Sequence, residues 1–313
     1  MARTLAHPRF LVRRPLAALL RQWPLAAADD VEAIHQTRVA TRRLREFVPI
    51  LAGGPEGSGA PTLRRRLRDI TRLYGPSREL DVSGMTLTAI ERRSPARAAA
   101  IASVRAHVER ERAKAGRVRR QAARGVDLAG LAAWARELAG WADSPVATRT
   151  CAARAAARLD RRVHELQEAL LGAGLIFAPA PLHRVRVALK KCRYALEVSA
   201  RLGRFRLAGS MRRLKRMQDL LGDLHDLQVL AGHARDAAAA DPASKRPPVE
   251  ALISDIDDEI RALHARFVIE RGGLVGVLAR STRVRDLLLE LPAAGEARTH
   301  TRRRRRGRRL QED

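Results

Sequence analysis

The sequence predicts an all-α protein built from two related helical halves. Alanine, leucine and arginine dominate, aromatic residues make up only 3% of the chain, and apolar residues recur at spacings of three, four and seven. That period is typical of helices packed on one face. An eleven-residue pattern also occurs twice, which indicates an internal repeat. Because each such helix buries one apolar stripe, we expect two helical bundles related by approximate two-fold symmetry.

Proline and glycine residues divide each half into six predicted helices. Those of the first half lie near residues 9–22, 29–51, 62–75, 78–92, 96–123 and 128–141. Those of the second half lie near residues 146–172, 180–203, 207–222, 224–240, 247–271 and 274–290. We therefore predict one domain over residues 1–292, with repeat one at about 8–141 and repeat two at about 146–290. Residues 293–313 form a low-complexity, arginine-rich segment that we expect to be disordered.

The repeated pattern begins with a histidine and continues with several cations. The first copy reads His35-Gln-Thr-Arg38-Val-Ala-Thr-Arg42-Arg43-Leu-Arg45, and the second reads His183-Arg-Val-Arg186-Val-Ala-Leu-Lys190-Lys191-Cys-Arg193. The similarity extends downstream, where residues 73–82 align with residues 220–229. In this alignment Arg78 and Glu79 lie over His225 and Asp226. Two copies of one unit suggest a pseudo-symmetric binding surface.

The cations of each pattern share one face of their helix. At about 100° per residue, Arg38, Arg42 and Arg45 fall on the side of His35, and the apolar residues fall opposite. In the helix predicted at 62–75, Leu63, Leu67, Ile70 and Tyr74 form the buried stripe, and Arg65, Arg68 and Arg72 lie opposite. The second half repeats this arrangement. A cationic face is usually only solvated, but here no acid lies between His35 and Arg45. Like charges at i and i+4 are therefore unrelieved, which favours an anionic ligand.

The composition also indicates a polyanionic partner. The chain has 61 Lys and Arg against 34 Asp and Glu, a formal charge of +27 and a pI of about 11.6, far beyond what solubility requires. Residues 294–313 hold eight arginines and three acids, so most of the excess lies on the helical body. The low aromatic content argues against a surface that stacks single-stranded nucleic acid.

Other kinds of site receive little support. Cys151 and Cys192 lack metal-ligand spacing and are expected to be reduced thiols. Glu79, Asp81 and Asp226 are better explained by pairing with the motif arginines than by a metal site, and His233 is expected to be structural. No Walker loop, nucleophile elbow or zinc-protease motif is present. We therefore predict no enzyme activity, no cofactor and no metal.

The doubled motif, together with Leu214-Lys-Arg-Met-Gln-Asp-Leu-Leu-Gly222-Asp-Leu-His225-Asp226, resembles the CHAD (conserved histidine α-helical) domain family over about residues 8–290. The resemblance implies two pseudo-symmetric four-helix bundles that bind inorganic polyphosphate through a basic groove. It also implies association with polyphosphate granules in bacteria. The E-x-E-x-K motif of the triphosphate-tunnel domain that often accompanies this module is absent, which agrees with a non-catalytic role.

The predicted partner is therefore inorganic polyphosphate, bound in the cytoplasm and at granules, with no membrane association. The alternative is a nucleic acid bound by the basic helix faces and by the tail at Arg302–Arg309. The oligomeric state is not determined by the sequence. The predicted polyphosphate-binding residues are His35, Arg38, Arg42, Arg43, Arg45, Arg65, Arg66, Arg68, Arg72, His183, Arg186, Lys190, Lys191, Arg193, Arg212, Arg213, Lys215, Arg216 and His225.

Overall fold

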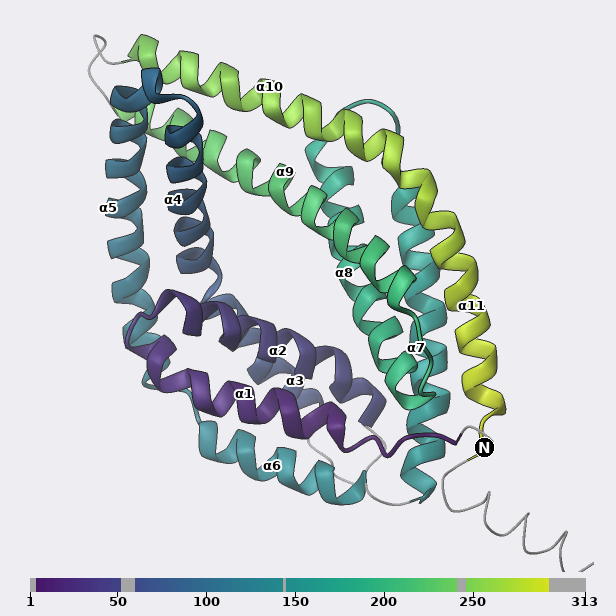
Figure 1. The fold of residues 1–313 in the computed structure, drawn as a ribbon. Helices are drawn as coiled ribbons and strands as arrows, with labels where there is room; N and C mark the ends of the chain where they lie inside the picture. The colour runs from purple at the N-terminus through teal and green to yellow at the C-terminus, as the bar shows by residue number, and fades with distance from the viewer. Residues whose placement is uncertain (1–3, 52–59, 143–144, 241–245, 293–313) are drawn as a thin grey trace, which may run out of the picture.

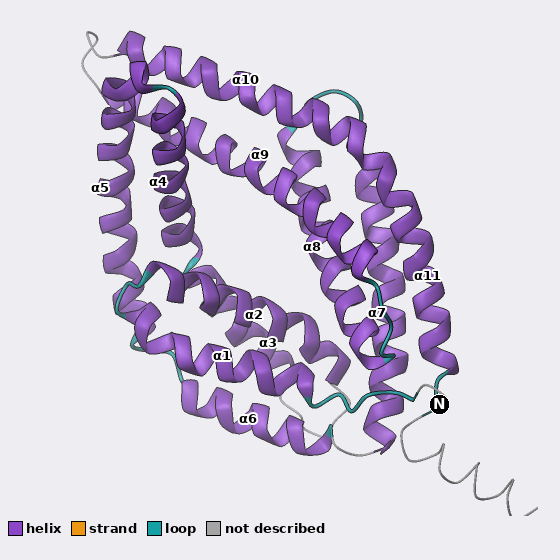
Figure 2. Cartoon of the chain, viewed as in Figure 1, coloured by secondary structure: helices purple, strands orange, loops and turns teal. Residues whose placement is uncertain are grey.

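The computed structural model describes residues 4–51, 60–142, 145–240 and 246–292. These residues form α-helices and two short 3-10 helices, and none of them lies in a strand (Figures 1 and 2). The predicted all-α class is confirmed, whereas the predicted tail lies outside the described residues. The helices are α1 (Phe10–Ala27), α2 (Val31–Leu51), α3 (Ala60–Leu73), α4 (Gly75–Arg93), α5 (Ala98–Ala123), α6 (Leu128–Trp141), α7 (Pro145–Leu171), α8 (Pro179–Leu202), α9 (Ala208–Ala240), α10 (Arg246–Glu270) and α11 (Val275–Glu290), with η1 (Pro95–Arg97) and η3 (Arg271–Leu274).

Helix α9 differs from the prediction, because the break expected after Gly222 is absent and one helix of 33 residues spans the region. A glycine inside a helix costs only about 1 kcal/mol, and the neighbouring leucines of α9 are buried in the core. At the aligned position in the first half, Gly75 is followed by Pro76. Proline has no N–H and is tolerated only in the first turn of a helix. Helix α3 therefore ends at Leu73, and α4 begins at Gly75 with Pro76 in its first turn.

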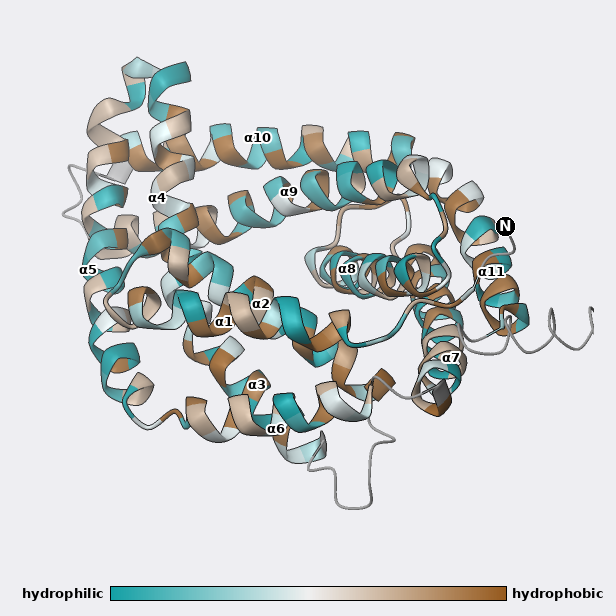
Figure 3. Cartoon of the chain, turned by 60° about the horizontal axis from the view of Figure 1, so that its bottom comes forward, coloured by the Kyte–Doolittle hydropathy of each residue, from teal (hydrophilic) through white to brown (hydrophobic). Residues whose placement is uncertain are grey.

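The buried apolar side chains form three clusters. One joins α1, α2, α3 and α6 to the beginning of α7. A second joins α7, α8 and α11 to the N-terminal half of α9 and the end of α10. In the third, α4 and α5 pack against the C-terminal half of α9 and against α10, as Figure 1 shows. Hydrophobic and hydrophilic residues alternate along these helices in Figure 3, as one-sided burial requires. Helices from both predicted repeats thus share a core, and the division into two repeats remains a prediction.

The ends of the described chain also connect the two halves. The backbone N–H of Leu5 donates to the carbonyl of Pro292 at 3.0 Å, and that of Ala6 donates to the carbonyl of Leu202 at 2.7 Å. Cys151 and Cys192 are buried free cysteines. Within the described ranges, no helix combines the length and the apolar character needed to cross a membrane.

Candidate functional site

Helices α2 and α8, which carry the two copies of the motif, pack against each other and bring their cations together. Arg42 on α2 lowers the pKa of Lys190 on α8, and Arg186 on α8 lowers the pKa of Arg38 on α2, in each case in addition to the larger effect of burial. Such effects require the charges of the two helices to share one region. We call this region the central cluster; its members are His35, Arg38, Arg42, Arg78, His183, Arg186, Lys190 and His225.

Arg38 is buried within the central cluster, with only 8% of its surface exposed. Its Nη1 donates to the backbone carbonyl of Thr71 at 3.0 Å. Burial and, next, the charge of Arg42 lower its pKa to about 10. The expectation that the whole cationic face points away from the core is therefore wrong for Arg38, because the end of α3 packs over it and supplies an acceptor.

The pKa of the Lys190 amine is strongly lowered. Burial is the largest cause and the charges of Arg186 and Arg42 follow, so that its pKa falls from 10.5 to about 7. Arg186 is also mostly buried, and its pKa is lowered by burial. Its Nη2 lies 3.9 Å from Asp226 Oδ1, which is too long for a strong hydrogen bond. The nearby carboxylate therefore relieves the repulsion only in part.

The three imidazoles of the central cluster have lowered pKa values. The rings of His183 and His225 lie 5.4 Å apart between centroids. Burial and, next, Arg186 lower the pKa of His225 to about 4. Burial and Arg78 lower the pKa of His35. A neutral imidazole can donate one hydrogen bond, and an anion nearby would favour protonation and a second.

Arg78 was not among the predicted site residues, although it lies in the central cluster. From α4, its charge lowers the pKa values of His35 and Arg38. It lies beside the first motif histidine as His225 of α9 lies beside His183. The downstream alignment, which places Arg78 over His225, was the signal that could have identified it. Glu79 is the acid that raises the pKa of Arg38, whereas Asp81 accepts a hydrogen bond from Arg112 of α5 at 2.6 Å. The predicted pairing of Asp81 with a motif arginine is therefore wrong.

The cations continue from the central cluster towards α3 and α7. Arg45 has a pKa lowered mainly by burial, and the charges of Arg64 and Arg68 on α3 and of Arg42 lower it further. Arg158 of α7 is buried and pairs with Glu46 at 2.6 Å. Neither Arg64 nor Arg158 is among the predicted site residues. The signal for Arg64 was its place beside the predicted Arg65 and Arg66, whereas no motif points to Arg158. Arg42 thus links the central cluster to a second group of cations.

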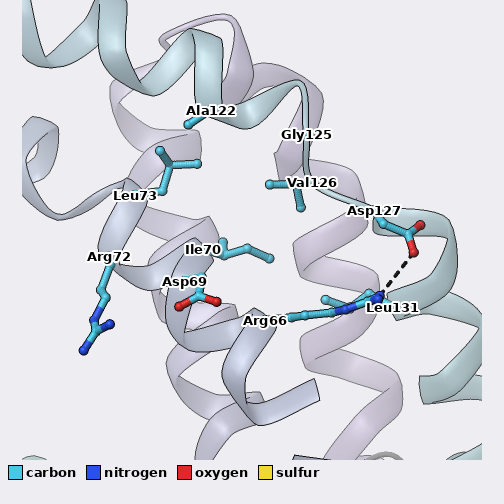
Figure 4. Close-up of a pocket in the computed structure, with 10 residues that line it drawn as sticks. All are labelled: Arg66, Asp69, Ile70, Arg72, Leu73, Ala122, Gly125, Val126, Asp127 and Leu131. Atoms are coloured by element: carbon cyan, nitrogen blue, oxygen red, sulfur yellow. Dashed lines mark hydrogen bonds and ion pairs between the residues drawn. The ribbon is translucent and has the colours of Figure 1, made fainter. Parts of the chain in front are cut away.

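Other predicted residues are held by partners elsewhere. In Figure 4 Arg66 points towards Asp127, which it pairs with at 3.1 Å, beside a cavity of about 480 Å³ between α3 and the α5–α6 connection. Arg72 extends away from that pair (Figure 4). The further pairings are Arg43 with Glu197 at 3.9 Å, Lys191 with Glu165 at 3.8 Å, Arg193 with Gln218 at 2.8 Å, Arg213 with the carbonyl of Gly273 at 2.8 Å, and Lys215 with Asp219 at 2.6 Å.

Three more predicted residues are exposed on their helices. These are Arg65, Arg212 and Arg216. None of the three is among the causes that shift the pKa values of Arg38, His183, Arg186, Lys190 and His225. The structure therefore brings together His35, Arg38, Arg42, His183, Arg186, Lys190 and His225, and extends them through Arg45 and Arg68.

Comparison with known proteins agrees with this architecture. The model of the CHAD domain family matches residues 11–235. A solved structure described as PptA from Streptomyces chartreusis is similar with a TM-score of 0.63 and 19% identity, over 87% of this chain and 100% of that one. The CHAD domain from the plant Ricinus communis is similar with a TM-score of 0.52 and 24% identity, over 85% of this chain and 93% of that one. No curated protein matches the chain.

Proposed function

The chain belongs to the CHAD domain family, which binds polyphosphate in general, and from this premise we propose that it binds inorganic polyphosphate, without catalysis, at the central cluster. In this proposal the polymer lies along the cations of α2 and α8, with α4 and α9 contributing Arg78 and His225. It then continues along Arg45 towards α3. Association with polyphosphate granules in the cytoplasm belongs to the same proposal.

The observation that carries the proposal is the unrelieved repulsion inside the central cluster. Burial removes water from Arg38 and Lys190, and like charges surround both. The acids nearby are few, and Asp226 is itself buried enough for its pKa to be raised. Such an arrangement destabilises the free protein. An anion bound there would relieve the repulsion and raise the pKa of each cation, so the energy stored in the free state favours binding.

Polyphosphate matches this arrangement chemically. It carries about one negative charge for each phosphate, and its oxygens accept the forked donors of arginine along its whole length. It has no bases, so a site without stacking aromatics loses nothing by binding it. Release of condensed counterions should contribute to the affinity, as it does for nucleic acids.

Titration with polyphosphates of graded length, monitored by calorimetry at fixed ionic strength, tests the proposal. We expect the affinity to rise with chain length until the polymer spans both groups of cations. Orthophosphate should bind far more weakly. Equal affinity for orthophosphate and for long chains would contradict a site that extends over several helices.

Nucleic acid is the alternative ligand, and competition distinguishes the two. If the central cluster is selective for a baseless chain, polyphosphate should displace a DNA duplex at low concentration, and DNA should displace polyphosphate poorly. The reverse order would mean that this surface serves a nucleic-acid-binding protein.

A further inference from the structure

A second group of chemically distinctive side chains lies between α5 and α9. His107 on α5 meets His233 and Asp236 on α9, and one ligand atom from each of the three lies within 4.8 Å of the others. The two rings are 5.8 Å apart between centroids. No hydrogen bond to either ring is found among the described residues, so their nitrogens are available as ligands.

The fold holds these side chains in place from both helices. His233 and Asp236 are three residues apart, so they share one face of α9. Val104 and Val108 flank His107 in sequence and are buried in the cluster that also contains Leu230 and Ala234 of α9. Packing of α5 on α9 therefore fixes the distance between the two helices at the level of the histidines, and the site needs little rearrangement.

A further carboxylate, that of Glu111, lies near this group. Glu111 follows His107 by four residues and lies on the same face of α5. A hydrogen bond from Lys114 at 2.6 Å lowers its pKa, and both His107 and His233 add to that effect. The Glu111 carboxylate therefore lies near both rings.

We propose that His107, His233 and Asp236 bind one divalent transition-metal ion, with zinc the best match, and that Glu111 or water completes the coordination. Two imidazoles and a carboxylate are a usual ligand set for zinc, with bonds of about 2.0–2.2 Å. In a tetrahedral site such bonds place ligand atoms about 3.4 Å apart. Small side-chain rotations close the observed spacing to that value. Magnesium and calcium prefer oxygen ligands and fit this set poorly.

This inference is independent of polyphosphate binding and differs from the sequence prediction of no metal. One turn before His233 on α9, the chain has no residue that could serve as a second ligand. His107 lies in the other half of the chain. Only the packing of α4 and α5 against the second half brings the two histidines together. Glu79 lies close enough to raise the pKa values of both His233 and Arg38, so the metal site would neighbour the central cluster.

The test is a titration of the full-length protein with zinc chloride at pH 7.5 in phosphate-free buffer, followed by calorimetry, with cobalt chloride as a spectroscopic probe. We expect one ion per chain and a cobalt absorption band typical of low coordination number. His107→Ala and His233→Ala should each weaken binding at least tenfold. Asp236→Asn, at an exposed position that leaves the core intact, should also weaken it and alter the cobalt spectrum.

Two controls locate the ion. His164→Ala removes an exposed histidine of α7 and should leave the titration unchanged. The double variant His183→Ala/His225→Ala removes the histidine pair of the central cluster and should also retain the ion. The proposal would be overturned if zinc binding were lost only in that double variant. It would also be overturned if Asp236→Asn and His233→Ala both bound zinc with wild-type affinity, or if the wild-type protein bound no stoichiometric zinc.

Discussion

Replacing Lys190 by methionine should stabilise the free protein while weakening its binding of polyphosphate. The side chain keeps a similar length and loses its charge. The fall of the Lys190 pKa from 10.5 to about 7 corresponds to about 5 kcal/mol, at about 1.4 kcal/mol for each pH unit by which a pKa moves. Relaxation of a flexible side chain reduces this value. We expect Lys190→Met to raise the free energy of unfolding at pH 7.5 by about 2–4 kcal/mol.

The pH dependence of stability gives a stricter test of the same reasoning. A basic group whose pKa is lower in the folded state destabilises the fold at any pH at which the unfolded chain holds the proton, because folding then forces the group to lose the proton or to remain charged while buried. For Lys190 this effect is absent above about pH 10.5, grows as the pH falls, and is constant below about pH 7. The difference in the free energy of unfolding between variant and wild type should therefore narrow by up to about 1.4 kcal/mol for each pH unit between pH 7.5 and 9.5.

Urea denaturation followed by circular dichroism measures both quantities. Lys191→Met is the matched control, because Lys191 is the next residue of α8, is half-exposed and lies 3.8 Å from Glu165; it should change stability by less than about 1 kcal/mol. Wild-type stability in Lys190→Met at pH 7.5, or parallel pH profiles, would refute the assignment of a desolvated, repelled amine. Calorimetry in two buffers of different ionisation enthalpy should also show proton uptake on polyphosphate binding at pH 7.5, and Lys190→Met should reduce it.

Three further predictions concern the same surface. Arg42→Gln and Arg186→Gln should each weaken polyphosphate binding by about 1.5–3 kcal/mol, the range for charged hydrogen bonds, whereas Arg280→Gln on α11 should have no effect; equal losses in a filter-binding assay would indicate nonspecific attraction. Glu79→Gln removes a carboxylate that now offsets the cations, so affinity should rise by about 0.2–1 kcal/mol, and an unchanged or lower affinity at low salt would contradict this. Deletion of residues 297–313 should leave polyphosphate affinity within about 1 kcal/mol and reduce DNA affinity more, and loss of most polyphosphate binding would assign the function to that segment.

Local patterns in the chain were sufficient for much of this architecture. Helical periodicity and the scarcity of aromatic residues predict the all-α class, and the doubled motif predicts the family. The motif also identifies Arg42, Arg186 and Lys190, because a helix with many cations and no intervening acid is already anomalous in sequence. These inferences depend on neighbours three or four residues away, whose geometry a helix determines.

Contacts between distant segments decided the rest. Gly222 does not end a helix because its neighbours pack into a core that periodicity cannot evaluate. Arg38 is buried because the end of α3 crosses over it. The pKa of Lys190 is lowered mainly because packing buries its amine, and Arg42 and Arg38 of α2 add to the effect of Arg186 on its own helix. His107 and His233 meet because α5 packs against α9. In each case the deciding interaction is desolvation or charge across a helix interface, which depends on the three-dimensional packing and not on the order of residues along one helix.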